Sequence, residues 1–300
     1  MNGRASDAPP DKGAVVITGT SSGIGHAAAL LLDGAGYQVF AGVRKHHDLE
    51  RLRGEGSPRF CPLLLDITNQ EQIDAAAALV AERLGPGRGL RALIDNAGTC
   101  EPGAIECIGV DRLRHQLETN LIGHVAVIQA FMPLIRRGPG RIVNVGSAMG
   151  DFPFPMLGAY AASKCAFAAM TDSLRRELRW WRIPVSLVVG GSVESALWDK
   201  TSRAPYIRPD GRAEDPGRLY EEMEGPIKDL MDQARRAAVG PDAIARVIKR
   251  ALEARRPKAR YRCGPGSRMA EVGRRLPESF TDWVIEKVLR KQLPTKVVGW

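Results

Sequence analysis

The sequence predicts an α/β fold in which helices cover both faces of a parallel sheet. Short apolar segments rich in β-branched residues alternate along the chain with longer stretches of helical periodicity. Most of the short segments are apolar throughout, as expected for strands that are buried on both faces. The helical stretches are long enough to connect neighbouring parallel strands by right-handed crossovers. This order predicts a doubly wound core.

The expected elements follow one another in a regular β-α order. The expected strands are 14–18, 37–43, 60–65, 90–95, 141–147 and 184–189. The expected helices are 24–33, 70–84, 111–135 and 160–181, with a last one at 280–289. No Ser-, Gly- or Pro-rich linker divides residues 14–265, so we expect one domain after a flexible leader at 1–13. Prolines and charges predict a substrate lid at about 194–240; 266–300 is expected to be a basic, helical C-terminal extension.

The composition restricts the class of protein. The 44% of apolar and 26% of charged residues are ordinary for a globular chain and exclude a disordered or fibrous one. The first residues lack the apolar stretch of a signal peptide, and no apolar run is long enough to span a bilayer, so we expect a cytoplasmic protein. The five cysteines form no CxxC pair, which predicts reduced thiols and no structural metal.

The net charge of +9 is concentrated toward the C-terminus. From Arg235 onward, 17 Lys and Arg stand against 6 Asp and Glu. Scattered charge of this kind usually forms a solvated surface, and we expect no nucleic-acid partner. Peripheral contact of the basic tail with a membrane surface is the weaker alternative.

A glycine-dense turn between the first strand and the first helix predicts a phosphate site. Residues 18–25 read T-G-T-S-S-G-I-G. Glycines let the backbone approach an anion, while free N–H groups and the helix dipole point toward it. The segment resembles the cofactor loop of the short-chain dehydrogenase/reductase family, T-G-x-x-x-G-[IL]-G. The resemblance implies a three-layer, doubly wound Rossmann fold with a mostly parallel seven-stranded sheet. It also implies that the cofactor is bound by Gly19, Ser21, Ser22, Gly23, Ile24 and Gly25.

The end of the second expected strand bears on the choice between NADP and NAD. Val43 stands where an acidic residue would bind the 2′-hydroxyl of NAD, and Arg44 follows it with a guanidinium that suits a 2′-phosphate. NADP(H) is therefore the preferred cofactor and NAD(H) the alternative. Arg44 could instead stack on adenine or face solvent. Asp66 and Ile67 match family positions beside the adenine, although an Asp before Thr is also a helix-start signal.

Two further segments resemble the cofactor site and depart from it at one position each. The family's N-N-A-G reads Asp95 followed by Asn96, Ala97 and Gly98, which replaces an amide by an acceptor-only carboxylate. After the sixth strand, the usual Pro-Gly is Gly190-Gly191, with Val193 two residues further on. The resemblance implies that Gly191 and Val193 cover the nicotinamide. A glycine pair predicts a looser turn and weaker cofactor binding.

Tyr160 and Lys164 lie four residues apart and therefore on one face of a helix. A phenol is a poor acid-base catalyst near neutrality, but a nearby ammonium favours the phenolate. Ser147 precedes Tyr160 by the thirteen residues that separate the family's carbonyl-orienting serine from its tyrosine. Asn120 matches the asparagine that holds water in a proton relay. The resemblance implies that Asn120, Ser147, Tyr160 and Lys164 interconvert a ketone or aldehyde and an alcohol, and that Tyr160 and Lys164 also contact the cofactor.

The sequence also bears on the substrate class and on the oligomeric state. Six apolar residues near the expected site line a lipophilic pocket or pack in the core: Phe152, Phe154, Met156, Leu157, Leu197 and Trp198. The second strand and the tail resemble the branch with retinol, hydroxysteroid and hydroxybutyrate dehydrogenases. The two longest helices imply a homodimer or homotetramer. Asp95 and Gly190 suggest an alternative, a catalytically weak nucleotide-binding regulatory protein, which the complete set of four active-site residues argues against.

Overall fold

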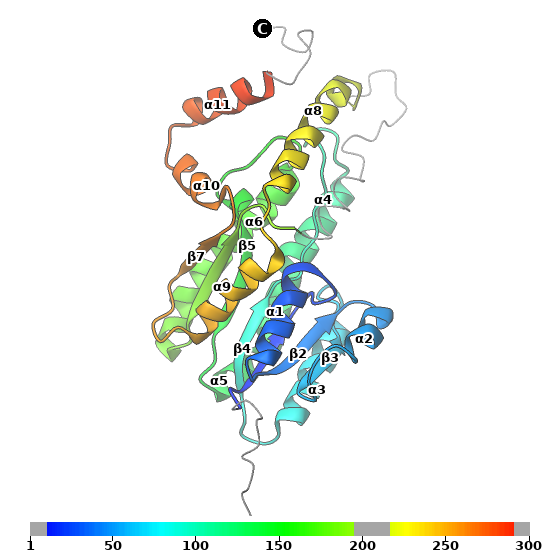
Figure 1. Cartoon of the computed structure of the whole chain (residues 1–300), viewed down its shortest axis with the longest axis vertical. Helices are drawn as coiled ribbons and strands as arrows, with labels where there is room; N and C mark the ends of the chain where they lie inside the picture. Colours follow the sequence, from blue (N-terminus) through cyan, green and yellow to red (C-terminus); the bar gives the residue numbers. More distant parts are fainter. Residues whose placement is uncertain (1–10, 195–216, 291–300) are drawn as a thin grey trace, which may run out of the picture.

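The computed structural model describes residues 11–194 and 217–290, which form a single α/β domain (Figure 1). Its seven strands form one sheet in the order β3-β2-β1-β4-β5-β6-β7, and all six neighbouring pairs are parallel. The strands are β1 (Ala14–Ile17), β2 (Gln38–Val43), β3 (Phe60–Leu64), β4 (Leu90–Asp95), β5 (Ile142–Ser147), β6 (Val185–Gly190) and β7 (Arg260–Cys263). The predicted Rossmann fold is confirmed.

Helices cover both faces of the sheet. On one face, α1 (Gly23–Gly34), α2 (His46–Leu52) and α9 (Pro241–Glu253) pack against strand residues such as Val15 and Ile17. On the other face, α3 (Gln70–Leu84), α5 (Gly123–Arg137) and the end of α6 (Gly158–Leu178) pack against residues such as Val16. The alternation along β1 arises because successive strand side chains point to opposite faces. Apolar strands with two buried faces explain the continuous apolar runs in the sequence.

The expected strands and helices are confirmed to within a few residues, with one exception. The stretch expected at 111–135 is confirmed as helical but is not one regular α-helix. It consists of α4 (Val110–Leu117), a π-helical turn (Glu118–Ile122) and α5. Gly123 lets this part of the chain pack against the carbonyl of Ile67, where a side chain would not fit. The edge strand β7 was not among the expected strands, because its R-Y-R-C sequence is mostly polar.

The strand order places a binding crevice at one edge of the sheet. The chain winds outward from β1 in one direction through β2 and β3, and from β4 in the other direction through β5 and β6. Ligands of such sheets bind beyond the carboxyl ends of the strands at this switch point. The phosphate loop follows β1, Asp95–Gly98 follows β4, and Ser147 ends β5. The topology therefore gathers the predicted segments at one edge.

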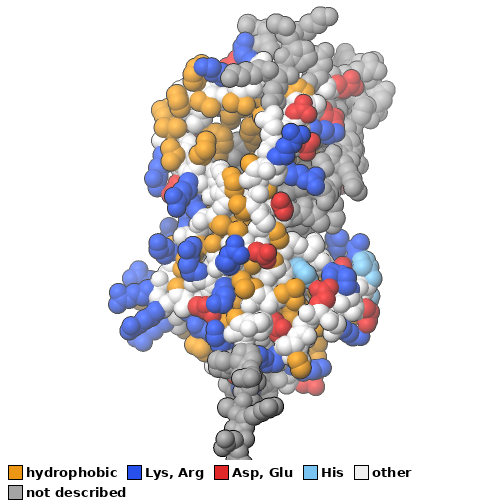
Figure 2. All heavy atoms as spheres, in the orientation of Figure 1, with side chains coloured by type: hydrophobic (Ala, Val, Ile, Leu, Met, Phe, Trp, Pro, Cys, Tyr) orange, Lys and Arg blue, Asp and Glu red, His pale blue; other side chains and the backbone are white. Residues whose placement is uncertain are grey.

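Three helices lie beyond this edge of the sheet: α8 (Gly217–Arg236), α10 (Ser267–Gly273) and α11 (Glu278–Arg290) (Figure 1). Leu289 and Ile285 of α11 belong to a small apolar cluster with Ile227 and Met231 of α8. Figure 2 shows hydrophobic side chains gathered around a hollow at this end of the molecule. Within the described residues, no helix has the length and apolar character needed to cross a membrane.

Candidate active site

The phosphate loop leaves an open space for an anion at the start of α1. Ser22 precedes the helix in an extended conformation without a side-chain cap, and the first turn carries no acidic residue. The N–H groups and the positive end of the helix dipole are therefore free to bind a phosphate. Gly19 has φ +68°, and a Cβ there would lie 2.7 Å from the Cα of Ala97. These features fit a dinucleotide.

Asn96 joins the phosphate loop to the end of β4. Its side-chain amide donates hydrogen bonds to the carbonyls of Thr18 and Gly19, both at 3.0 Å. The backbone N–H groups of Asn96 and Ala97 donate to the hydroxyl of Thr18 at 2.9 and 3.1 Å. Gly25 allows this contact, because a Cβ at that position would clash with both the Gly19 carbonyl and the Asn96 amide.

Ser147, Tyr160 and Lys164 come together above the carboxyl end of β5. Ser147 is the last residue of β5, and α6 begins eleven residues later at Gly158. The Ser147 side chain is hydrogen-bonded to that of Tyr160. The ammonium of Lys164 lies 3.4 Å from the carbonyl oxygen of Val145 and 5.9 Å from the centre of the Tyr160 ring. The structure thus brings these three predicted residues together.

Asn120 joins this group from the π-helical turn. Its fully buried amide donates to the carbonyl of Thr99 and to the hydroxyl of Ser163, both at 3.0 Å, and its Oδ1 accepts from the Thr99 N–H at 2.8 Å. A Cβ at Gly98 would lie 3.4 Å from Asn120 Oδ1 and 3.7 Å from Lys164 Nζ. Asn120 and Lys164 therefore flank the predicted cofactor residue Gly98.

Burial shifts the protonation of both reacting side chains toward their neutral forms. Burial lowers the pKa of Lys164 to about 8, and the nearby Cys100 opposes this shift. Burial also raises the pKa of Tyr160 well above its ordinary value; Cys100 adds to the rise and the hydrogen bond from Ser147 reduces it. The sequence led us to expect a phenolate favoured by Lys164, but in this structure the desolvation of Tyr160 dominates. Its hydroxyl is protonated at neutral pH.

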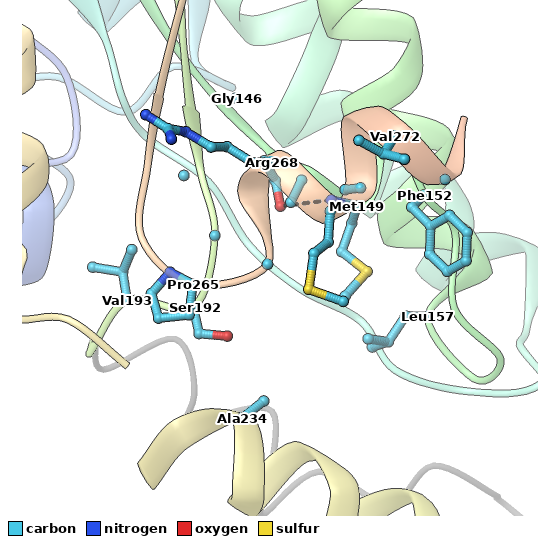
Figure 3. Close-up of a pocket in the computed structure, with 18 of the residues that line it drawn as sticks. Gly146, Met149, Phe152, Leu157, Ser192, Val193, Ala234, Pro265, Arg268 and Val272 are labelled. Atoms are coloured by element: carbon cyan, nitrogen blue, oxygen red, sulfur yellow. Dashed lines mark hydrogen bonds between the residues drawn. The ribbon is translucent and has the colours of Figure 1, made fainter. Parts of the chain in front are cut away.

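A cavity of about 690 Å³ opens onto Ser147 and Tyr160. Figure 3 shows Met149, Phe152 and Leu157 on one side of it, with Val193 and Pro265 across from them. The cavity also reaches the predicted cofactor residues Ile24 and Gly191. A further part of the wall, which the sequence did not reveal, comes from α10, α11 and the turn between them: Arg268, Met269, Ala270, Val272, Gly273, Leu276, Phe280, Thr281 and Val284.

The apolar residues predicted near the site divide into three groups. Phe152 and Leu157 line the cavity. Phe154 and Met156 belong instead to the apolar cluster beneath α8, so their role is packing. Leu197 and Trp198, like most of the first half of the predicted lid, lie outside the described residues. Cys100 and Met149 line the cavity without having been predicted.

An ion-pair cluster attaches the cavity wall to the loop after Ser147. The carboxylate of Asp151 is buried and pairs with Arg262 at 2.6 Å and with Arg260 and Arg274 at 3.4 Å. Arg262 also pairs with Glu271 of α10 at 2.8 Å. Because three cations share one buried carboxylate, this cluster holds β7 and α10 in a defined position beside the active site.

The turn after β6, which the sequence predicted to be loose, is bonded to its neighbours. The Gly191 N–H donates to the Cys263 carbonyl at 2.8 Å, and the Ser192 N–H donates to Pro265 at 3.1 Å. Both partners belong to β7 and the loop after it, and a Cβ at Gly191 would clash with that loop. Gly191 is thus required by close packing against the loop that follows β7, a strand not expected from the sequence.

The residues predicted around the adenosine lie apart from the cavity. Arg44 is exposed at the end of β2, next to the edge of the sheet that carries the phosphate loop. Asp66 Oδ1 accepts hydrogen bonds from the Thr68 N–H at 3.0 Å and its hydroxyl at 2.8 Å, as in a helix-start turn. Ile67 is buried. Arg51, which was not predicted, donates to the Ser21 carbonyl at 2.6 Å.

Comparison with known proteins agrees with this geometry. The family model described as short chain dehydrogenase matches residues 13–205. The chain is 34% identical over 294 residues to estradiol 17-beta-dehydrogenase 2 of Mus musculus, covering 93% of this chain and 75% of that protein. It is 30% identical over 284 residues to an NADPH-dependent 3-dehydrocapnine reductase of Ornithobacterium rhinotracheale, covering 92% of this chain and 97% of that protein.

Solved structures show the same fold. A short-chain dehydrogenase from Streptomyces avermitilis superposes with a TM-score of 0.73 at 27% identity, covering 95% of this chain and 99% of that one. One from Burkholderia cenocepacia J2315, solved in complex with NADP, gives 0.69 at 24% identity and covers 91% and 96%. The chain therefore belongs to the short-chain dehydrogenase/reductase family. It is an oxidoreductase of the kind that acts on CH–OH groups with NAD(P).

Gly25→Ala is expected to abolish NADPH binding, because the added Cβ would separate the phosphate loop from Asn96. Gly34→Ala at the other end of α1 is the matched control, since nothing lies within 4 Å of a Cβ there. NADPH titration by fluorescence and a thermal melt measure both variants. Normal NADPH affinity in a folded Gly25→Ala protein would contradict the proposed phosphate site.

Proposed function

We propose that this enzyme interconverts a lipophilic ketone or aldehyde and the corresponding alcohol, with NADP(H) as the preferred cofactor. The observation that carries the proposal is the position of Tyr160 and Ser147, which share a hydrogen bond and line a mainly apolar cavity that also reaches Ile24 and Gly191. A substrate in the cavity has its oxygen beside two hydroxyls. The substrate carbon then lies toward the residues assigned to the nicotinamide.

Tyr160 is the proton donor in the reductive direction. Its hydroxyl is protonated at neutral pH, so it transfers a proton to the substrate oxygen while Ser147 donates a hydrogen bond to the same oxygen. The ammonium of Lys164 stabilises the phenolate that Tyr160 becomes. Bound nicotinamide supplies or accepts the hydride. Asn120 is assigned to the path that returns a proton from solvent, and Lys164 also to the nicotinamide ribose.

The lining of the cavity supports a lipophilic substrate. Its wall is built mostly from apolar side chains, and several of them also form its exposed rim (Figure 2). Met269 is 78% exposed, Val272 56% and Phe280 47%. Exposed apolar side chains at the mouth of an apolar cavity favour the entry of an apolar molecule. A relative named for estradiol is consistent with such a substrate.

We expect a homo-oligomer in the cytoplasm. A groove between α5 and α6 is lined by Met132, Met170 and Leu174 among others, and the two helices are those that the family resemblance assigned to a dimer or tetramer interface. None of the five cysteines, all of which lie within the described residues, is in a disulfide, which suits a reducing compartment. Size-exclusion chromatography with light scattering tests the assembly.

Tyr160→Phe is expected to lower kcat by about 10²–10⁴-fold, because it removes the general acid and leaves the ring in place. NADPH affinity should change little. A panel of apolar ketones, aldehydes and secondary alcohols supplies the assay. Tyr220→Phe is the control, since its hydroxyl bonds Glu106 and does not line the cavity. Turnover close to that of the unmodified enzyme would refute the mechanism.

The pH profile of reduction reports on Lys164. Below a pH of about 8 its ammonium stabilises the phenolate, and as pH rises through that value the charge is lost. We therefore expect kcat/KM for carbonyl reduction to fall above about pH 8. In Lys164→Arg, any residual activity should lack this decline, because a guanidinium stays protonated. The same decline in that variant would assign it to another group.

Arg44→Ser is expected to raise the KM for NADPH by about 10–100-fold, since it removes a charge-assisted hydrogen bond to the 2′-phosphate. The KM for NADH should stay constant. Lys45→Ser, at the next exposed position, is the control for a general loss of positive charge. An equal loss for both cofactors would show that Arg44 stacks on the adenine instead.

A further inference from the structure

Asp95 and His124 form a completely buried pair behind the catalytic group. Asp95 ends β4, and His124 is the second residue of α5, one helical turn after Asn120. Both side chains are 0% exposed, and His124 Nδ1 lies 3.5 Å from Asp95 Oδ1. Among the described residues, no regular hydrogen bond reaches either carboxylate oxygen or His124 Nδ1, so each of these buried atoms has the other side chain as its nearest polar group. An acidic side chain in this position needs compensation from its neighbour.

The hydrogen bond of His124 Nε2 determines which ring nitrogen of His124 carries a hydrogen. His124 Nε2 lies 2.9 Å from the carbonyl oxygen of Ala97, which can only accept, so Nε2 carries a hydrogen. If the ring had no second hydrogen, a lone pair on Nδ1 would face an unprotonated carboxylate inside the protein. A proton between Nδ1 and Oδ1 removes that repulsion. The pair is then neutral as a whole, whichever of the two atoms holds the proton.

The surroundings of the pair favour this neutral state. The ring of Phe167 packs on His124 with its centre 4.6 Å away. From α6, Phe167 also carries the ammonium of Lys164 near its ring, 5.5 Å from the ring centre. From β5, Asn144 lies opposite Asp95 and offers an uncharged amide. A net charge on the pair would carry a large desolvation cost in these surroundings.

Ala97, whose carbonyl is bonded by His124, connects the buried pair to the candidate active site. Its backbone packs against Gly19 of the phosphate loop, and Gly98 follows it between Asn120 and Lys164. Asn120 bonds Thr99, and His124 bonds Ala97 from one turn further along the same face. Two side chains of the π-helical turn and α5 therefore hold both ends of residues 97–99.

We propose that Asp95 and His124 are positioning residues that share one proton and, as a neutral pair, hold the Ala97 carbonyl and with it the cofactor-binding segment after β4. This inference rests on the proposed function for its effect on NADPH. It explains how the chain accommodates a carboxylate where the family resemblance implies an amide. The proton stays within the pair and takes no part in the reaction.

Three single variants distinguish the contact of the His124 ring with Asp95 from its hydrogen bond to Ala97. Asp95→Asn keeps a partner for Nδ1, because its amide donates to a neutral His124, and NADPH affinity should be retained. In His124→Gln, the amide takes the place of Nε2 and can bond the Ala97 carbonyl, but Asp95 is left without a partner. In His124→Asn, the shorter amide reaches Asp95 but not the Ala97 carbonyl. Both are expected to weaken NADPH binding by about tenfold or more, the order of one lost buried hydrogen bond.

The double variants provide the decisive comparison. Adding Asp95→Asn should restore NADPH binding to His124→Gln, because the uncompensated carboxylate is gone. It should not restore binding to His124→Asn, which still lacks the bond to Ala97. Rescue of both variants, or of neither, would overturn the proposal, as would a loss of affinity in Asp95→Asn equal to that in Asp95→Leu.

Two measurements without cofactor test the shared proton itself. In ¹⁵N-histidine NMR, His124 should show Nε2 protonated and Nδ1 either protonated or sharing the proton of Asp95, whereas in Asp95→Asn its Nδ1 should be unprotonated and accept only from the amide. An Nδ1 without a proton contact in the unmodified protein would refute the pair. These spectra do not depend on turnover, so a failure of the proposed enzymatic function leaves them readable.

The folding equilibrium supplies the second measurement. Above about pH 6.5 an unfolded histidine releases its proton, whereas the folded pair keeps one. The ratio of folded to unfolded protein should therefore fall by up to about tenfold per pH unit, relative to Asp95→Asn, until the folded pair also loses its proton. Urea unfolding between pH 6 and 9 measures the difference. Parallel curves for the two proteins would contradict the inference.

Discussion

The close approach of two chain segments, the phosphate loop after β1 and residues 95–98 after β4, is the constraint on which the active site depends. The Asn96 amide bonds two carbonyls of the loop, and only hydrogen atoms fit at Gly19 and Gly25. Because β1 and β4 are neighbours at the point where the sheet winds in both directions, their ends must share this small space. The uncapped N-terminus of α1 is a result of this packing, and so is the position of Gly98 beside Lys164.

The π-helical turn connects that constraint to the chemistry. An extra residue in one helical turn directs Asn120 inward, where it bonds Thr99 and Ser163. His124 follows on the same face and bonds Ala97. A regular helix through these residues would point some of these side chains elsewhere, since the period of the helix sets which residues share a face. The irregular turn is thus the structural reason that two polar side chains from one helical stretch, Asn120 and His124, form hydrogen bonds with the segment after β4.

The apolar cavity determines the protonation of the groups inside it. Burial raises the pKa of Tyr160, which keeps its phenol protonated at neutral pH, and lowers the pKa of Lys164 to about 8, so its ammonium is lost as pH rises through that value. The same walls that desolvate these groups would bind an apolar substrate. Part of the wall comes from α10 and α11, and Asp151 with its three arginines attaches β7 and α10 to the loop after Ser147. Substrate binding, catalysis and the C-terminal helices are therefore connected by short contacts.

The order of strands and helices, the phosphate loop and the set of Asn120, Ser147, Tyr160 and Lys164 could be predicted from the sequence, because each depends on local periodicity or spacing. Other features could not. The edge strand β7 has a polar sequence that becomes a strand only by pairing with β6, and the π-helical turn at 118–122 precedes a close approach of Gly123 to Ile67 that joins distant parts of the chain. The pair of Asp95 and His124 joins residues 29 positions apart, and the wall of α10 and α11 comes from more than 100 residues beyond Tyr160. The sequence by itself determined the class of fold and the local segments that carry the candidate site residues; only the tertiary structure decided how these residues are buried and which of them lie together, because desolvation and long-range contacts exist only once the chain has folded.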